Sequence, residues 1–298
     1  MAAFLHLSSG VSEGNMRRMV IVVILALLVA GAAVAALWPL RTVSYFTSRQ
    51  GYSVRVGIPY GPLATQKLDV YTPDGVAADA PAVVFFHGGS WEIGNKDEYG
   101  FVGQALASAG VIVVVANYRV SPAVVFPAFV EDGAVAVAWA LAGLRGHPIF
   151  VAGHSAGAHI AALIATDEHY LANAGAPPHA LAGFIGLSGP YDFLPLTEVR
   201  YKRIFPEATR DTSQPINFID GGEPPMLLLT GDADRVVDPG NSKRLAAAVV
   251  AKGGKATVTV YPGVGHLGTM LALAGVLPYP KPPVRADILA FITAVTGR

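Results

Sequence analysis

The chain has 298 residues, of which 52% are apolar and only 14% are charged, and it contains no cysteine. This length excludes a disulfide-stapled mini-protein and allows one large domain or two smaller ones, while the missing cysteines exclude disulfides, thiolate metal ligands and a thiol nucleophile. Because 21 Lys and Arg residues balance 21 Asp and Glu residues, the chain has no net charge that would attract nucleic acid.

The first predicted element is an apolar helix near the N-terminus. A polar segment covers residues 1–18. The next segment, residues 19–40, contains no Asp, Glu, Lys or Arg. At about 1.5 Å per residue, this run is long enough to cross the ~30 Å hydrocarbon core of a bilayer. Arg17-Arg18 stands before the span, so the positive-inside tendency predicts a membrane anchor with the rest of the chain on the non-cytoplasmic side.

A secretory signal peptide is the alternative interpretation of the same segment. The triplet Ala33-Val34-Ala35 resembles a small-residue cleavage site, and cleavage there would give a secreted or periplasmic protein. The apolar run is, however, longer than the ~7–15 residues of a usual signal core. We therefore expect an uncleaved transmembrane helix.

Eight strands are predicted beyond the anchor. Alternation of polar and apolar residues in 52–58 and 67–71 is typical of antiparallel strands with one face in water. The other six are continuously apolar and rich in β-branched residues, as is typical of parallel strands covered on both faces. They are residues 82–86, 111–116, 149–152, 181–187, 226–230 and 257–261.

Five helices are predicted between and after these strands, at residues 99–109, 129–144, 159–165, 242–252 and 284–295. Alternation of strand and helix implies βαβ units, and hence a mostly parallel central sheet flanked by helices. The sequence therefore predicts a single α/β domain over residues 42–298. Its longest connection, residues 189–225, is rich in Pro, Asp and Arg and is predicted to form a small lid.

A strained serine turn is predicted where the strand at 149–152 ends. The sequence there is Gly153-His154-Ser155-Ala156-Gly157, a complete G-x-S-x-G motif followed by a helical pattern. Only small neighbours allow the chain to turn this sharply and expose a serine hydroxyl. Ser155 is therefore the candidate nucleophile.

A serine hydroxyl needs a base to take its proton and a carboxylate to orient that base. Of eight histidines, only His266 follows the last predicted strand, which makes it the candidate base. Asp232 and Asp234 follow the strand at 226–230, and Asp192 follows the preceding one. All of these positions lie at the carboxyl edge of a parallel sheet, where ligands bind in open α/β sheets.

Donors for a developing oxyanion are predicted beside the same edge. The strand at 82–86 runs into His87-Gly88-Gly89-Ser90-Trp91, whose glycines let the backbone approach a substrate carbonyl closely. The N–H of Ala156, next to the candidate nucleophile, would complete the site. Fixed N–H donors of this kind are worth ~3–4 kcal/mol each in acyl transfer.

Taken together, H-G-G-S-W, Asn117-Tyr118-Arg119, G-H-S-A-G, G-D-A-D-R-V-V and the late G-H resemble the α/β-hydrolase superfamily over about residues 50–298. They are most similar to its esterase and lipase branch, which includes BD-FAE-like feruloyl esterases and hormone-sensitive lipase and has kynurenine formamidase and prenylcysteine methylesterase as relatives. One departure is that the third glycine common in the hormone-sensitive-lipase motif is Ser90 here.

The resemblance implies an α/β-hydrolase fold, Asp234 as the acid of a Ser155, His266 and Asp234 triad, and Gly89, Ser90 and Ala156 as oxyanion donors. It implies a serine hydrolase that cleaves small-molecule carboxylic esters through an acyl-serine intermediate. An arylformamidase, an acyltransferase and a catalytically silent binding module on the same scaffold are the alternatives. No H-E-x-x-H motif, Walker loop or G-x-G-x-x-G after the first strand is present, so neither a metal nor a cofactor is predicted.

Overall fold

A computed structural model describes the chain at residues 20, 39–47, 50–277 and 280–297, which form two compact units, 1–42 and 43–298. Helix α2 (Pro39–Tyr45) begins in the first unit and ends in the second, and the elements below belong to the second. Among the described residues, no helix is both long and apolar enough to span a bilayer. The membrane helix predicted at 19–40 lies almost entirely outside them.

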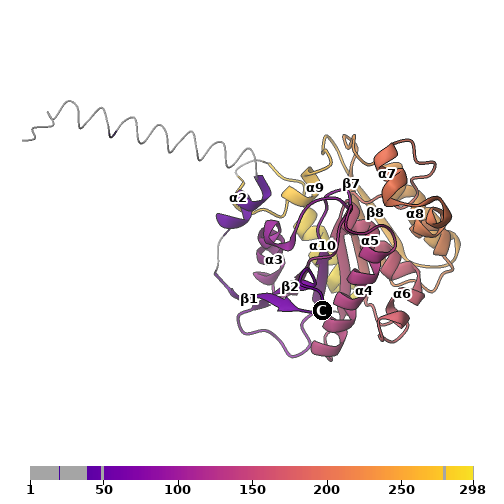
Figure 1. The fold of residues 1–298 in the computed structure, drawn as a ribbon. Helices are drawn as coiled ribbons and strands as arrows, with labels where there is room; N and C mark the ends of the chain where they lie inside the picture. Colours follow the sequence, from indigo (N-terminus) through magenta and orange to yellow (C-terminus); the bar gives the residue numbers. More distant parts are fainter. Residues whose placement is uncertain (1–19, 21–38, 48–49, 278–279, 298) are drawn as a thin grey trace, which may run out of the picture. The chain divides into compact units, whose positions relative to one another are not determined.

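One eight-stranded sheet forms the centre of the second unit (Figure 1), in the order β1-β2-β4-β3-β5-β6-β7-β8. The β1–β2 and β2–β4 pairs are antiparallel and every other pair is parallel, which confirms the predicted mostly parallel sheet. The bounds are β1 Tyr52–Pro59, β2 Lys67–Pro73, β3 Ala82–Phe86, β4 Ile112–Ala116, β5 Ile149–His154, β6 Gly183–Leu187, β7 Met226–Gly231 and β8 Ala256–Tyr261.

Strand β2 differs from its prediction as a strand with one face in water. Leu68, Asp69, Val70 and Tyr71 are all buried. The polar member of this run, Asp69, is buried because its carboxylate forms an ion pair with the buried Lys96 at 2.9 Å. Alternation alone predicts that this polar position faces water. The ion pair with a residue from another part of the fold allows it to be buried instead.

Helices cover both faces of the sheet (Figure 1). Helices α3 (Gly100–Ala107) and α10 (Val284–Thr296) contact each other on one face. On the other face, α4 (Ala128–Gly143) contacts α5 (Ala156–Thr166) and α6 (Glu168–Asn173), and α8 (Gly240–Ala251) packs on β7 and β8. The helix after the serine begins at Ala156 rather than at the predicted residue 159, because the small residues of the motif already form its first turn.

Several short elements have no counterpart in the predictions because they are too short to show a periodic pattern. They are α6, α7 (Val199–Ile204), α9 (Gly268–Leu271) and the 3₁₀ turns η1 (Lys96–Glu98), η2 (Glu207–Thr209), η3 (Asp211–Ser213) and η4 (Pro215–Phe218). Helix α7 and the last three turns belong to the connection 189–225. Tyr191, Ile204 and Phe205 bury their side chains there, so this connection packs on the domain through its own apolar residues.

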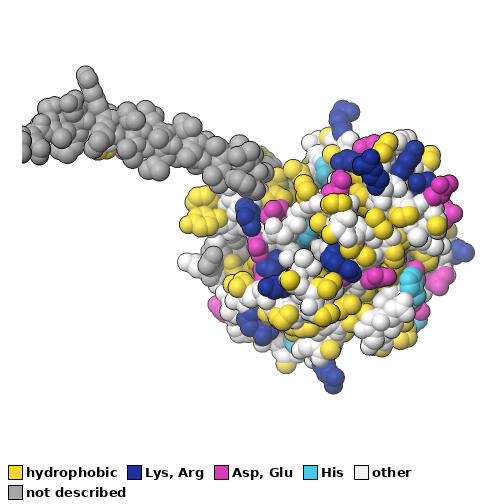
Figure 2. All heavy atoms as spheres, in the orientation of Figure 1, with side chains coloured by type: hydrophobic (Ala, Val, Ile, Leu, Met, Phe, Trp, Pro, Cys, Tyr) yellow, Lys and Arg dark blue, Asp and Glu magenta, His cyan; other side chains and the backbone are white. Residues whose placement is uncertain are grey.

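The surface agrees with the balanced composition. On the face drawn in Figure 2, Lys and Arg side chains are interspersed with Asp and Glu side chains and with apolar ones. A mixed surface of this kind produces no broad field of one sign on that face.

Candidate active site

The serine turn between β5 and α5 has the strained backbone that its sequence predicts. Ser155 has φ +54°, a left-handed conformation that is costly for a residue with a side chain. A Cβ at Gly153 would overlap the backbone of Gly157, and a Cβ at Gly157 would overlap the carbonyl oxygen that ends β3. The glycines of the motif are therefore required by close backbone packing on both sides of the serine.

Three predicted side chains meet at the carboxyl edge of the sheet. Ser155 Oγ lies 2.9 Å from Nε2 of His266, and Nδ1 of that ring lies 2.8 Å from Oδ2 of Asp234. A carboxylate can only accept, so Nδ1 carries the ring proton and Nε2 presents a lone pair to the serine hydroxyl. The side chain of Asp234 is fully buried and that of His266 is 11% exposed. This arrangement can take a proton from Ser155 as its oxygen attacks.

The carboxylate of Asp234 is held in its charged form. Burial alone would raise its pKa, but hydrogen bonds from His266 and from the backbone N–H groups of Val237 and Val236 lower the pKa of Asp234 below its ordinary value. The two amides lie 2.9 and 3.0 Å from Oδ1, which leaves Oδ2 for the imidazole. Both oxygens are therefore satisfied.

The structure does not bring the two competing aspartates to His266. Asp232 accepts a hydrogen bond from the backbone N–H of Gly263 at 2.6 Å, so it ties the loop after β7 to the loop after β8. Asp192 forms an ion pair with Arg244 at 2.5 Å. Of the three candidates, only Asp234 touches the imidazole.

The loop after β3 is strained in the manner of an oxyanion site. Gly89, Ser90 and Trp91 have φ values of +125°, +54° and +60°. A Cβ at Gly88 would lie 3.3 Å from Cβ of Ser155, which places the loop directly against the candidate nucleophile. Within the described part of the chain, the backbone N–H groups of Gly89, Ser90 and Ala156 have no hydrogen-bond partner. They are available to a ligand, and their role as oxyanion donors stays a prediction.

A cavity of about 330 Å³ opens at the serine and is lined by both Ser90 and Ser155. Its remaining walls come largely from the connection 189–225 and from the loop after β7. They combine apolar side chains (Trp91, Phe193, Leu194, Tyr201, Val236 and Val237) with Arg244, which is paired to Asp192 and Asp238. Polar and apolar side chains line this cavity in nearly equal numbers, so beside a reactive hydroxyl it suits a small organic substrate that has both polar and apolar parts.

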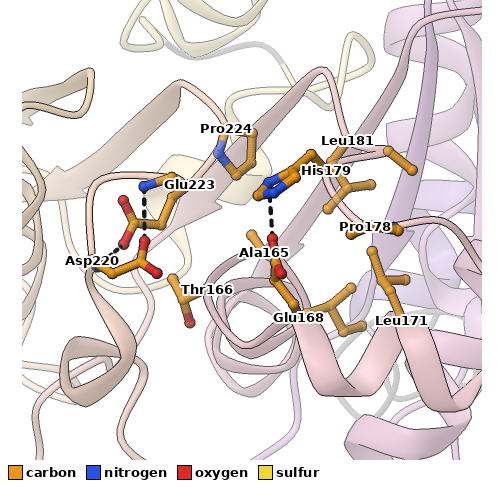
Figure 3. Close-up of a pocket in the computed structure, with 13 residues that line it drawn as sticks. Ala165, Thr166, Glu168, Leu171, Pro178, His179, Leu181, Asp220, Glu223 and Pro224 are labelled. Atoms are coloured by element: carbon orange, nitrogen blue, oxygen red, sulfur yellow. Dashed lines mark hydrogen bonds and ion pairs between the residues drawn. The ribbon is translucent and has the colours of Figure 1, made fainter.

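A second hollow, of about 40 Å³, lies between α5, α6 and the segment before β7 (Figure 3) and contains none of the predicted site residues. His179 pairs there with Glu168 at 2.8 Å, and Glu223 accepts from the N–H of Asp220, whereas the buried hydroxyl of Thr166 has no hydrogen-bond partner among the described residues. The predicted nucleophile Ser155 lines the other, larger cavity. Among the described residues, no group of three or more His, Asp or Glu side chains could hold a metal ion.

The sequence did not reveal how the neighbouring histidines support this site. Nε2 of His154 lies 3.0 Å from the carbonyl oxygen of His266, so the residue beside the nucleophile also fixes the backbone of the base. Burial, reinforced by the nearby His266, lowers the pKa of His154 to about 3. Nδ1 of His87 donates to the carbonyl oxygen of Gly88 at 2.8 Å. The G-x-S-x-G and H-G-G motifs locate these residues, but spacing gives no signal for their partners.

Known proteins share this architecture. A model of the BD-FAE family matches residues 68–249, more than half of the chain. The chain belongs to the BD-FAE family. Its esterase B neighbour from Lactobacillus rhamnosis has a TM-score of 0.74 at 19% identity, covering 92% of this chain and 97% of the neighbour. That likeness shows that this BD-FAE member has the α/β-hydrolase fold predicted from its motifs.

Curated relatives of this BD-FAE member include two kinds of enzyme. A kynurenine formamidase from Salmo salar is 35% identical over 144 residues, which are 47% of each chain. The isoprenylcysteine alpha-carbonyl methylesterase ICME from Arabidopsis thaliana is 31% identical over 278 residues, covering 84% of this chain and 64% of the relative. The matches thus span about half of the length of the first relative and less than two thirds of the second.

Proposed function

We propose that this protein is a serine hydrolase that cleaves carboxylic esters of small molecules through an acyl-serine intermediate, with residues 42–298 as its catalytic domain. The observation that carries the proposal is the unbroken hydrogen-bonded chain from Ser155 Oγ to His266 at 2.9 Å and on to Asp234 at 2.8 Å. The 31% identity to a methylesterase over 84% of this chain supports the choice of an ester.

In the proposed mechanism, Ser155 Oγ attacks the ester carbonyl while its proton passes to Nε2 of His266. The resulting imidazolium is stabilised by the buried carboxylate of Asp234. His266 then returns the proton to the alkoxide that leaves, and an acyl-serine remains. Water, deprotonated by the same imidazole, attacks the acyl group, and the proton then passes back to Ser155 as the carboxylic acid departs.

The tetrahedral intermediates carry a negative oxygen, which we assign to the N–H groups of Gly89, Ser90 and Ala156. Gly89 and Ser90 lie on the strained loop after β3, and Ala156 is the first residue of α5. The three donors can therefore approach the oxygen from both sides of Ser155. The apolar walls of the 330 Å³ cavity would hold the acyl or alcohol group and exclude water from it.

The proposal is tested by active-site labelling and turnover. The wild-type chain should react with a fluorophosphonate probe and hydrolyse p-nitrophenyl esters, and Ser155→Ala should abolish both. Ser188→Ala is the matched control, because Ser188 is a buried serine at the end of the neighbouring strand whose hydroxyl bonds Thr269 at 3.0 Å. Labelling that persists in Ser155→Ala and disappears in Ser188→Ala would place the nucleophile elsewhere.

Hydrolysis of an aryl formamide is the second candidate, favoured by the 35% identity to a kynurenine formamidase. The same triad could cleave a formyl amide, provided that His266 protonates the departing amine. The ratio of kcat/KM for p-nitrophenyl acetate to that for formanilide separates the two candidates. We expect the ester to be preferred, and a preference for formanilide would reverse the order.

We also propose that residues 19–40 anchor the protein in a membrane, with the catalytic domain on the non-cytoplasmic side. The uncharged run and the preceding Arg17-Arg18 support this proposal. Full-length protein should stay in the membrane pellet after alkaline carbonate extraction. An intact N-terminus is expected on N-terminal sequencing, whereas a new terminus near residue 36 would support cleavage of a signal peptide.

A further inference from the structure

His159 lies inside the domain, four residues after the candidate nucleophile on helix α5. It has no exposed surface, and both of its ring nitrogens have partners. Nδ1 lies 3.2 Å from the indole Nε1 of Trp91, and Nε2 lies 2.7 Å from the carbonyl oxygen of Ser213. One imidazole therefore joins the helix of the nucleophile, the loop of the oxyanion donors and the connection 189–225.

The partners fix the tautomer of this ring. An indole N–H can only donate, so Nδ1 of His159 must be the acceptor, and a carbonyl can only accept, so Nε2 must carry the proton. A single neutral tautomer satisfies both bonds. Burial lowers the pKa of His159 to about 4, which keeps the ring in this neutral form above that pH.

Trp91 sits in a loop that needs support. It and Ser90 are consecutive non-glycine residues with positive φ, a conformation that costs ~1–3 kcal/mol per residue and persists only when its surroundings hold it. The indole ring provides that hold: it is 4% exposed, and it packs edge-on against Phe205 at a centroid distance of 4.8 Å. Within the described residues, His159 is its only side-chain hydrogen-bond partner.

We propose that His159 is a positioning residue that holds the indole of Trp91 and, through it, the backbone N–H of Ser90 in place for the oxyanion. The inference rests on the proposed hydrolase function and deepens it. Without an acceptor, the buried indole N–H would be left unsatisfied, and the loop would relax toward another position. Displacement of an oxyanion donor weakens binding of the transition state more than binding of the ester, so the loss appears in kcat.

Two substitutions at residue 159 separate its two hydrogen bonds. Asparagine places an amide oxygen close to the position of Nδ1, so His159→Asn keeps an acceptor for Trp91 and loses the bond to Ser213. Glutamine reaches the position of Nε2, so His159→Gln keeps the donor to Ser213 and loses the acceptor. On a p-nitrophenyl ester, we expect His159→Asn to keep kcat within about threefold of wild type. His159→Gln should lose about tenfold to a hundredfold in kcat, with KM changed less than about threefold.

Trp91→Phe tests the same bond from its other end and leaves His159 intact. It should lower kcat about as much as His159→Gln does, and the double variant should be no slower than the slower single one, because both changes remove one interaction. Losses that multiply in the double variant would overturn the proposal. Trp91→Phe also serves as the test if a variant at residue 159 fails to fold.

Phe129→Leu controls for general loosening of the aromatic cluster. Phe129 is fully buried, its ring lies 6.3 Å from that of Trp91, and it forms no side-chain hydrogen bond. The variant should lower the melting temperature and leave kcat within about threefold of wild type. A kcat loss as large as that of His159→Gln, or equal kcat values for the Asn and Gln variants, would refute a positioning role.

Failure of this inference is distinguishable from failure of the proposed function. If wild type hydrolyses the ester and the Asn and Gln variants do not differ, only the inference fails. If wild type hydrolyses no ester and does not react with the fluorophosphonate probe, the proposed function fails and the inference fails with it.

Discussion

Three histidines that are buried in their neutral form should make this protein sensitive to acid. His87, His154 and His159 are at most 2% exposed. Burial lowers the pKa of His87 and of His159 to about 4, and burial together with the nearby His266 lowers the pKa of His154 to about 3. In the unfolded chain the same side chains have the ordinary pKa of about 6.5.

The sign of the effect follows from the two sets of pKa values. As the pH falls below about 6.5, the unfolded chain takes up protons that the folded chain does not, so acid favours unfolding. The contribution of these residues to stability is complete above pH ~6.5 and is lost progressively as the pH falls toward the folded values of about 4 and 3. The lowered pKa of Asp234 acts only at lower pH, near the ordinary carboxylate value of ~4.

The size of the loss can be worked from these values. Each of these histidines has a folded pKa of about 4 or 3 and an unfolded pKa of about 6.5. Each therefore lowers the free energy of unfolding at pH 5 by ~2 kcal/mol relative to pH 8. Three such residues cost ~6 kcal/mol together. Because a folded domain is stable by only ~5–15 kcal/mol, a loss of this size brings the protein close to unfolding at pH 5.

Urea unfolding followed by circular dichroism at pH 8 and pH 5 measures this loss. The wild-type free energy of unfolding should fall by ~6 kcal/mol between the two values, and that of His154→Gln by ~4 kcal/mol. Glutamine is chosen because its amide nitrogen can still donate to the carbonyl oxygen of His266. An equal pH dependence in wild type and variant would refute the reasoning.

Three further predictions concern the triad, a buried ion pair and the serine turn. Asp234→Asn should lower kcat by ~10³–10⁴-fold on p-nitrophenyl esters, and Asp232→Asn by less than about threefold, with the reverse ranking counting against the assigned acid. Arg119→Met strips the counter-charge from Asp132, whose side chain is 1% exposed, so urea unfolding should show a loss of ~3–5 kcal/mol; a loss under ~1 kcal/mol would contradict it. Gly157→Ala should cost at least ~2 kcal/mol in thermal unfolding, since its Cβ would overlap backbone oxygens, and an unchanged melting temperature would show that the turn can relax.

The strand and helix predictions fail where long-range contacts decide the outcome. Alternation in residues 67–71 predicts a strand with one wet face, yet β2 is buried on both faces because Lys96, from a distant turn, neutralises Asp69. Helix α6 is too short for a periodic signal and is held instead by the side chain of Asp167, which caps its first turn. Local pattern cannot report a partner that lies far away in the sequence.

The candidate site shows the same division. The motif around Ser155 and the position of His266 after the last strand could be recognised from sequence, since both depend on local turns at known strand ends. Reasoning from the residues alone left open whether Asp232 or Asp234 is the acid of the triad, and only the family resemblance favoured Asp234. The hydrogen bond from the imidazole to Asp234 is a tertiary fact, as is the bond between His159 and Trp91.

The sequence by itself determined the parallel sheet, the serine turn and the family, because buried strands and tight glycine turns impose their residue types locally. The tertiary structure alone decided which carboxylate meets the base, which buried imidazoles support the loops, and which side chains line the cavity. The physical reason is that hydrogen bonds and desolvation depend on groups that lie far apart in the sequence, 32 residues for Asp234 and His266 and 68 for Trp91 and His159, and no local pattern records those encounters.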